Sequence, residues 1–167
     1  MSAAYDWTRF VVRIDIHAPV QKLYDGWATR HGMESWFLRL SEYRKEDGDL
    51  RHREEHAESG DLYKWLWYGY PDDTVEYGKI LEANGKDLFR FNFGKAGNCT
   101  VKIYQQMGES IVEINQDSIP DDDHGRAYWH IGCKTGWTFY LANMKSWIEG
   151  GIDLRNKNEL IQGVINA

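Results

Sequence analysis

The first apolar pattern of the chain has a period of two residues. In residues 10–16, FVVRIDI, apolar side chains at positions 10, 12, 14 and 16 alternate with a face that carries Arg13 and Asp15. Successive side chains of a strand point to opposite sides of the sheet, so this period is typical of a strand that buries one face. The pattern predicts the first strand of the protein.

Helical spacing follows this strand. Pro19 suits the first turn of a helix, and PVQKLYDGWATR then places apolar side chains three or four residues apart. HGMESWFL, residues 31–38, predicts a second short helix. LRLSEYRKED predicts a strand that runs into a charged stretch, residues 45–60, which we expect to be an exposed loop or a solvated helical turn.

Five further runs predict strands, and clusters of Gly, Asn and Asp separate them: LYKWLWY, TVEYGKILE, DLFRFNF, CTVKIYQQ and SIVEINQ. Connections this short join antiparallel neighbours, so the runs predict a meander. Alternation in the first run places Tyr63, Trp65 and Trp67 on one face and Lys64 on the other. Because it carries no lysine, the aromatic face is the candidate for the concave side.

The same alternation groups the rings of DLFRFNF. Phe89, Phe91 and Phe93 share one face, whereas Arg90 and Asn92 point outward. We expect these three phenylalanines to face the last helix of the chain.

One long helix is predicted over residues 126–149. The carboxylates at positions 121–123 suit its positive amino end, and Gly150 and Gly151 end it. Gly132 and Gly136 each cost about 1 kcal/mol relative to alanine inside a helix, which indicates that a neighbouring element packs closely there. Side chains at three- and four-residue steps predict an apolar stripe: Trp129, Cys133, Gly136, Trp137, Tyr140, Met144 and Trp147.

The order of elements is therefore a strand, two helices, a run of antiparallel strands and one long carboxyl-terminal helix. A curved antiparallel sheet has one face to bury, and only the last helix is long enough to cover it. We expect an α+β fold in which six or seven strands wrap around that helix. A chain of 167 residues fits one domain, so residues 1–167 are expected to form a single domain.

The tail after the long helix is apolar in part. Leu160, Ile161 and Val164 predict one more helical turn. These side chains leave two alternatives open, packing on the sheet or packing on a second copy of the chain in a homodimer.

Aromatic content is the unusual feature of the composition. Eight Trp, ten Tyr and six Phe occur in a chain with 42% hydrophobic and 28% charged residues and no membrane segment. Each large ring buries roughly 150 to 250 Å². These are more rings than a core of this size needs, so some of them are expected to line something other than plain core.

Charge and cysteine content restrict the partners. A net charge of −6 argues against nucleic acid, because a phosphate backbone requires a basic face. The first residues, MSAAYDWTRFVVRIDIHAP, do not resemble a signal peptide, so a cytoplasmic protein is expected. Cys99 and Cys133 lie 34 residues apart without a CxxC partner, which favours reduced, partly buried thiols.

Several of these segments resemble a known family. IDIHAPVQKLYDGWAT, the pair Trp36 and Phe37, YGKILE, and the late helix with Gly136 and Trp137 followed by LANMKSWIEGG are similar to the START-like, helix-grip superfamily (SRPBCC). The resemblance covers residues 7–150, and it is greatest for the branch related to the activator of the ninety-kilodalton heat-shock protein ATPase. Residues 45–60 depart from the family, which usually has a Gly-rich turn before its meander.

The resemblance implies a seven-stranded antiparallel sheet around a long carboxyl-terminal helix, with a cavity that in many members holds an apolar small molecule. The rings assigned to this ligand-binding cavity come from three segments: Tyr63, Trp65, Trp67, Phe89, Phe91, Trp129, Trp137 and Tyr140. A fully packed core without a ligand is the alternative. Tyr63, Tyr140 and Gln116 are the polar groups expected to orient a ligand; the alternative for each is a satisfied hydroxyl in the core or an exposed amide.

Metal and catalytic motifs are weak. His52 and His56 match the H-x-x-E-H pattern of zinc peptidases, but RHREEHAESG has almost no apolar face to bury against a cleft, so a solvated loop is favoured. The acidic run at 121–123 lacks the ligand spacing of a calcium loop, which favours helix capping. We expect no cofactor, no metal and no catalytic residue, and His130 is expected at the boundary of the core.

Three functions remain open. The first is binding of a lipid-like or aromatic small molecule in the cavity without catalysis. The second, implied by the branch, is an interaction module that acts on a chaperone ATPase through its outer surface. The third is a cyclase- or lyase-type enzyme, which would need an acid–base group with a shifted pKa facing the pocket. Strand alternation places most carboxylates, such as Glu113, on the opposite face.

Overall fold

The sheet contains seven antiparallel strands in the spatial order β1-β7-β6-β5-β4-β3-β2. They are seen in a computed structural model that describes residues 3–165. The first strand pairs with the last, so that Phe10 lies opposite Gln116 and Ile16 opposite Ser110. The strands have the following bounds: β1 Phe10–Ile16, β2 Leu40–Arg44, β3 Leu62–Leu66, β4 Val75–Ala83, β5 Leu88–Asn92, β6 Asn98–Gln106 and β7 Glu109–Asp117.

Two short helices follow β1, as predicted. α1 (Val20–Ala28) begins directly after Pro19, and α2 (Arg30–Trp36) follows after the single residue Thr29. The Thr29 hydroxyl accepts a hydrogen bond from the Gly32 amide at 2.9 Å and thereby caps α2. The close turn between the two helices is possible because Gly32 has no Cβ, which would overlap the Asp25 carbonyl.

The long helix has two parts. A π-helical segment, η2 (Gly125–Ile131), leads into α3 (Gly132–Gly150). The Asp122 carboxylate accepts a hydrogen bond from the Gly125 amide at 2.7 Å, which confirms the capping role of the acidic run. At the other end, Gly151 adopts a left-handed conformation with φ of +71°, and the helix stops where the glycine pair predicted.

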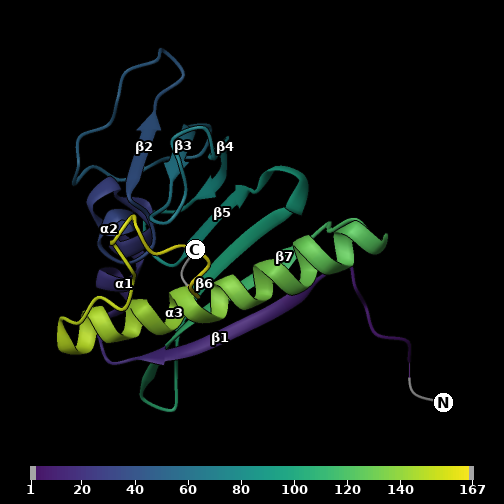
Figure 1. The fold of residues 1–167 in the computed structure, drawn as a ribbon. Coiled ribbons are helices and arrows are strands. Elements are labelled where there is room, and N and C mark those ends of the chain that lie inside the picture. Colours follow the sequence, from purple (N-terminus) through teal and green to yellow (C-terminus); the bar gives the residue numbers. More distant parts are fainter. Residues whose placement is uncertain (1–2, 166–167) are drawn as a thin grey trace.

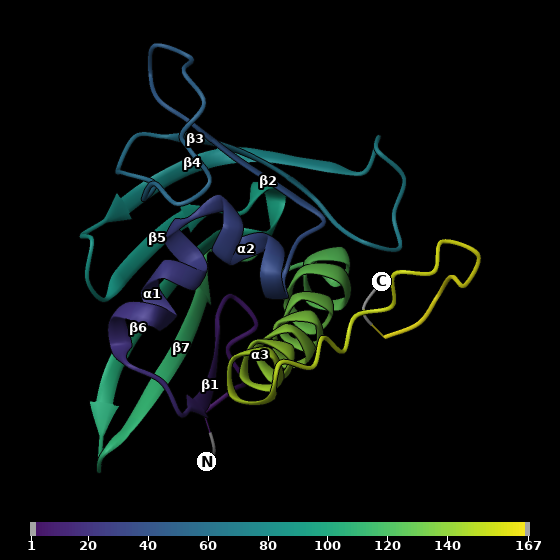
Figure 2. The ribbon, with the colours of Figure 1, turned by 90° about the vertical axis from the view of Figure 1, so that its left-hand side faces the viewer.

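All three α-helices lie on the concave side of the sheet (Figures 1 and 2). α3 runs along β1, and α1 and α2 pack where the sheet curls toward them. The side chains that the helices and the sheet bury together form one continuous apolar cluster. This confirms the predicted α+β class and the curved antiparallel sheet wrapped around a long carboxyl-terminal helix.

Residues 45–60 form a loop that is mostly exposed, as predicted, but two of its residues, Arg51 and Ala57, are buried. The Arg51 side chain is buried, and its guanidinium forms an ion pair with the buried carboxylate of Asp61. Two backbone hydrogen bonds tie this loop to the helices, from Ala57 to Ala28 at 2.7 Å and from His31 to Arg53 at 3.0 Å. The charge pattern did not indicate the burial of Arg51, which is possible because its charge is paired and hydrogen-bonded.

The tail also differs from its prediction. Residues 151–165 contain no helical turn, and Leu160 is 94% exposed. The tail is held instead by Arg155, whose buried guanidinium donates to the carbonyl oxygens of Glu34, Ser35 and Leu38 at 2.9–3.1 Å. One arginine therefore caps the carboxyl end of α2, and this contact replaces the hydrophobic packing that the apolar tail residues indicated.

Candidate functional site

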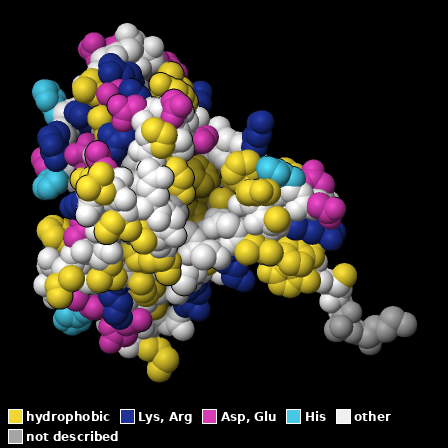
Figure 3. Space-filling model, viewed as in Figure 1, with side chains coloured by type: hydrophobic (Ala, Val, Ile, Leu, Met, Phe, Trp, Pro, Cys, Tyr) yellow, Lys and Arg dark blue, Asp and Glu magenta, His cyan; other side chains and the backbone are white. Residues whose placement is uncertain are grey.

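An apolar pocket opens between α3 and the ends of β3 and β5. Its volume is about 160 Å³, and hydrophobic side chains are visible in the hollow on this face of the molecule (Figure 3). Six of the nine residues that line it are aromatic, and none is charged. They come from η2, from α3, and from the residues that directly follow α2, β3 and β5: Phe37, Trp67, Phe93, Tyr128, Gly132, Cys133, Gly136, Trp137 and Tyr140.

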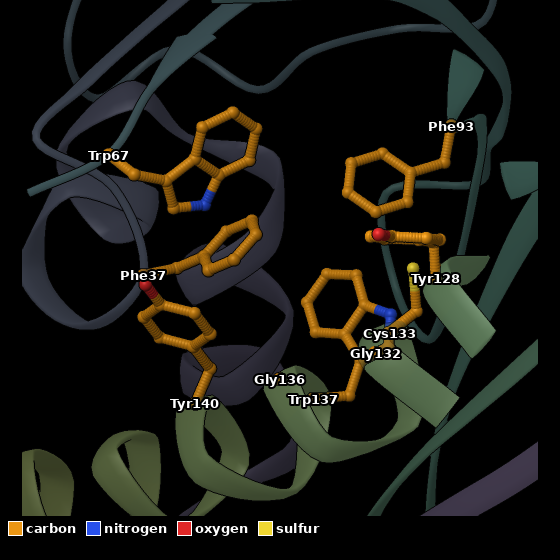
Figure 4. A pocket seen from close by; sticks show the side chains of 9 residues that line it. All are labelled: Phe37, Trp67, Phe93, Tyr128, Gly132, Cys133, Gly136, Trp137 and Tyr140. Atoms are coloured by element: carbon orange, nitrogen blue, oxygen red, sulfur yellow. The ribbon is translucent and has the colours of Figure 1, made fainter. Parts of the chain in front are cut away.

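The rings of the pocket form two groups, which meet where Phe37 contacts Trp137 (Figure 4). Trp67, Phe37 and Tyr140 form one group, and Phe93, Tyr128 and Trp137 form the other. Ring centroids lie 4.8 Å apart for Phe37 and Tyr140, 4.9 Å for Phe37 and Trp137, and 5.8 Å for Phe93 and Trp137. Contacts at these distances hold the rings against one another, so the walls of the pocket are already formed.

The two glycines of α3 make room for the pocket. A Cβ on Gly136 would have no atom within 4 Å, and one on Gly132 would meet only the Ala127 carbonyl oxygen, at 3.7 Å. The expectation of a closely packed neighbour at these positions is therefore wrong. Any larger side chain here would project into the pocket, so the absence of side chains keeps part of it empty.

A buried amide fixes Trp137. The indole N–H of Trp137 donates to Gln116 Oε1 at 2.9 Å, and Gln116 donates its own amide to the Ala96 carbonyl at 2.9 Å. Gln116 is fully buried, and its bonding groups are used inside the protein. Tyr63 is similar, because its hydroxyl donates to the Asn92 carbonyl at 2.6 Å. Of the three polar groups expected to orient a ligand, only Tyr140 lines the pocket.

The eight predicted cavity residues do not all meet at the pocket. Trp67, Trp137 and Tyr140 line it. Four rings point inward as the strand alternation predicted, but they are packed into the solid core beside the pocket: Tyr63, Trp65, Phe89 and Phe91. In this group Tyr63 stacks on Trp65 with 3.8 Å between ring centroids, which leaves no space between them.

Trp129, the eighth predicted residue, packs against the core but does not line the pocket. Its ring contacts His124 edge to face at 5.7 Å. The π-helical turn has more residues than an α-turn, so it changes which side chain faces the sheet. Tyr128, which is 64% exposed, lines the pocket in place of Trp129. At the far end of the predicted stripe, Trp147 is exposed.

Sequence reasoning missed Phe37, Phe93, Tyr128 and Cys133 as lining residues. A signal existed for Phe93, because it continues the alternation of Phe89 and Phe91 beyond the end of β5. No comparable signal existed for Phe37, which follows α2 and reaches the pocket because α2 packs against α3. Its position depends on contacts between segments far apart in the chain.

The thiols are neutral at physiological pH. Burial raises the pKa of Cys133, and it raises that of Cys99 even more. Both cysteines are free, as the sequence predicted, with Cys99 buried and Cys133 at the pocket wall. Burial also raises the pKa of the Tyr140 hydroxyl. The pocket therefore offers uncharged, mostly apolar surface rather than an ionised nucleophile.

The H-x-x-E-H segment lies outside the pocket and is not helical. His56 Nε2 lies 2.7 Å from an Asp25 carboxylate oxygen, and Glu55 accepts one hydrogen bond from Arg51 and one from the His52 amide. Within residues 3–165 no group of three His, Cys, Asp or Glu side chains could hold a metal ion. His130 is buried rather than at the boundary, and it links Tyr5 and the Trp7 carbonyl through hydrogen bonds of 2.8 Å.

This architecture, a curved seven-stranded antiparallel sheet around a long carboxyl-terminal helix with two short helices after the first strand, is the START-like helix-grip fold. Solved structures of this fold confirm the assignment. A protein from Staphylococcus saprophyticus superimposes with a TM-score of 0.68 and 17% sequence identity, over 88% of this chain and 96% of its own.

Two further solved structures are similar to this chain over most of its length. The Aha1 dimer from Colwellia psychrerythraea matches with a TM-score of 0.63 and 14% identity, over 86% of this chain and 97% of its own. DynU16, a putative protein in the dynemicin biosynthetic locus, matches with a TM-score of 0.63 and 15% identity, over 90% of this chain and 50% of its own. At these identities the similarity establishes the fold.

No protein-family model matches the chain. No curated protein sequence matches it either. Among the helices of residues 3–165, none combines the length and the apolar character needed to cross a membrane.

Proposed function

We propose that this protein binds an apolar, ring-containing small molecule in the pocket between α3 and the sheet, and that it does so without catalysis. The observation that carries the proposal is the pair of helix glycines, Gly132 and Gly136, that face open space between aromatic walls. Glycine inside a helix costs about 1 kcal/mol relative to alanine. No neighbouring side chain packs closely against these glycines, so no packing contact offsets that cost. A ligand bound in the open space would offset it.

The size of the pocket limits the ligand. A dry protein cavity of about 150 Å³ is known to bind benzene, so about 160 Å³ accommodates one six-membered ring. Tyr128 lines the pocket and is exposed, so the pocket opens to solvent on this side. A larger molecule would therefore place one ring between Phe37, Phe93 and Trp137 and leave the remainder outside.

Filling the pocket from the helix tests the proposal. Gly136→Leu places a side chain in the empty space, and it replaces the glycine with a good helix former. We expect this variant to be more stable by about 1 kcal/mol and to lose binding of ethylbenzene and 2-phenylethanol. Ligand-observed NMR and calorimetric titration measure the binding, and thermal unfolding measures the stability.

The matched control is Thr135→Leu, which introduces the same leucine at an exposed neighbouring position of α3. It should leave binding unchanged. Trp67→Ala removes one wall of the pocket and should weaken binding. If the wild-type protein binds neither ring compound at millimolar concentration, or if Gly136→Leu binds as well as the wild type, the pocket is not a ligand site.

A second candidate is an interaction module that acts on a chaperone ATPase. The similarity to the Aha1 dimer favours it, together with the resemblance of the sequence to the activator branch. In that case the outer surface would act, and Gly136→Leu would leave the activity intact. Addition of the protein to the chaperone from the same source, with the ATPase rate as the measurement, separates the two candidates.

A further inference from the structure

Glu76 is a carboxylate on the concave face of the sheet. It lies on β4 directly opposite Trp65 of β3, whose ring is fully buried. Directly opposite residues of an antiparallel pair share one face, so Glu76 points toward the helices. Its neighbour Tyr77 points the other way and is exposed. Glu76 itself is half-buried.

The backbone next to the pocket makes room for this carboxylate. Gly94 directly follows Phe93, a wall of the pocket, and has a φ of +49°. A Cβ on Gly94 would overlap the carboxylate of Glu76. Glycine tolerates this left-handed conformation and also leaves the space that the carboxylate occupies. The carboxylate of Glu76 is therefore at the sheet wall, beside Phe93.

No group of the described chain compensates the charge of Glu76. Burial raises its pKa, and within residues 3–165 no hydrogen bond or nearby cation acts in the opposite direction. After burial, the charge of Glu76 is a further cause of the raised pKa values of Tyr63 and Cys133. Glu76 does not itself line the pocket, but its charge contributes to the raised pKa of Cys133, which does.

We propose that Glu76 gives the pocket a preference for ligands that combine an aromatic ring with a protonated amine, an inference that rests on the proposed function. An ammonium group would supply the missing partner of a half-buried carboxylate, and a charged group away from water is stable only when it is paired. The six aromatic rings of the lining add a second attraction, because their faces carry negative potential.

An anionic ligand lacks such support. None of the nine lining residues is a lysine or an arginine. A carboxylate or phosphate bound in the pocket would also be repelled by the charge of Glu76. The combination of aromatic walls and one unpaired carboxylate therefore distinguishes amines from neutral and acidic molecules of the same shape.

Three compounds of nearly equal size test this preference: 2-phenylethylamine, 2-phenylethanol and 3-phenylpropanoate. At pH 7.5 we expect the wild-type protein to bind the amine about tenfold more tightly than the alcohol, and the acid most weakly. Glu76→Gln keeps the size of the side chain and removes its charge. This variant should bind the amine and the alcohol equally, with the affinity for the alcohol unchanged.

Glu82→Gln is the matched control, because Glu82 is an exposed carboxylate on the same strand. It should keep the preference for the amine. If the wild type binds the alcohol as tightly as the amine, or if Glu76→Gln keeps the preference, the inference about Glu76 is wrong while the proposed ligand pocket stands. If none of the three compounds binds, the proposed function fails and this inference fails with it.

Discussion

The indole of Trp137 in the last helix and the amide of Gln116 in the last strand share a buried hydrogen bond of 2.9 Å. This bond connects the pocket wall on α3 to β7. Gln116 also accepts from the Cys99 thiol at 3.4 Å and donates to the Ala96 carbonyl. The orientation of Trp137 in the pocket therefore depends on a residue that does not touch the pocket.

Replacing Gln116 by Leu should destabilise the protein and loosen the pocket. The substitution leaves the indole N–H of Trp137 and the Ala96 carbonyl without partners, and an unsatisfied buried polar group costs about 1 to 3 kcal/mol. We expect a lower unfolding temperature and weaker binding of ring compounds. Asn115→Thr on the same strand is the control, because the Asn115 side-chain oxygen is buried without a partner. An unchanged unfolding temperature in Gln116→Leu would contradict this account.

Arg155 should be a major determinant of stability at the other end of α3. It donates to three carbonyl oxygens of the α2 region and to the Asp153 carboxylate at 2.8 Å. Arg155→Ala leaves these buried groups unpaired, and breaking a buried pair costs about 3 kcal/mol or more. Chemical denaturation measures the loss. Lys157→Ala, which removes the exposed partner of Asp153, should cost under about 1 kcal/mol.

The same contact predicts sensitivity to acid. Burial alone would raise the pKa of Asp153, but hydrogen bonds from Arg155 and Lys157 outweigh it and hold the pKa well below its ordinary value. An acid with a lowered pKa stabilises the folded state above its ordinary pKa and loses this effect as the pH falls. Wild-type stability should therefore fall below about pH 4. Asp153→Asn should flatten that part of the stability profile, and an unchanged slope would count against the pair.

Glu76 predicts the opposite pH dependence. Burial raises its pKa, so the folded state holds this proton to higher pH than the unfolded chain does. Its contribution is favourable at low pH and is lost as the pH rises through the raised pKa. Glu76→Gln should therefore raise the unfolding temperature at pH 8 and leave it unchanged at pH 4. Glu82→Gln should have no effect at either pH, and an equal gain in both variants would exclude a special environment for Glu76.

Reaction of Cys133 with iodoacetamide gives a further readout of the pocket. Burial is the main cause of its raised pKa, and the charge of Glu76 adds to it. We expect slow modification at pH 8, faster modification in Glu76→Gln, and protection by a bound ring compound. Mass spectrometry of digested protein distinguishes Cys133 from the fully buried Cys99, which should stay unmodified. Equal rates in the wild type and Glu76→Gln would place Glu76 too far from the pocket.

Much of the architecture follows from local patterns. The alternation of FVVRIDI and the five later runs predicted the strands, and the helical spacing around Trp27 and Tyr140 predicted the helices. Tyr63, Trp65, Phe89 and Phe91 point inward as predicted, because a strand turns alternate residues to the same side. Periodicity is a property of adjacent residues, so the sequence alone determines it.

The shape of the space between these rings, unlike the direction in which each ring points, does not follow from local sequence patterns. Whether inward rings touch or leave a gap depends on how far α3 lies from the sheet, and on side chains from segments that are distant in the chain. The four strand rings fill the core, and the gap remains where Gly132 and Gly136 face Phe37 and Phe93. The π-helical turn at Gly125–Ile131 then selects Tyr128 instead of Trp129 for the rim.

The sequence by itself therefore determined the order of the elements, the inward face of each strand and the two ends of the last helix, because backbone geometry and caps act over a few residues. Only the tertiary structure decided where the pocket lies, that Arg51 and Arg155 are buried and paired, and that Glu76 is half-buried without a partner among the described residues. Burial and pairing are set by contacts between distant segments, and such contacts exist only once the chain is folded.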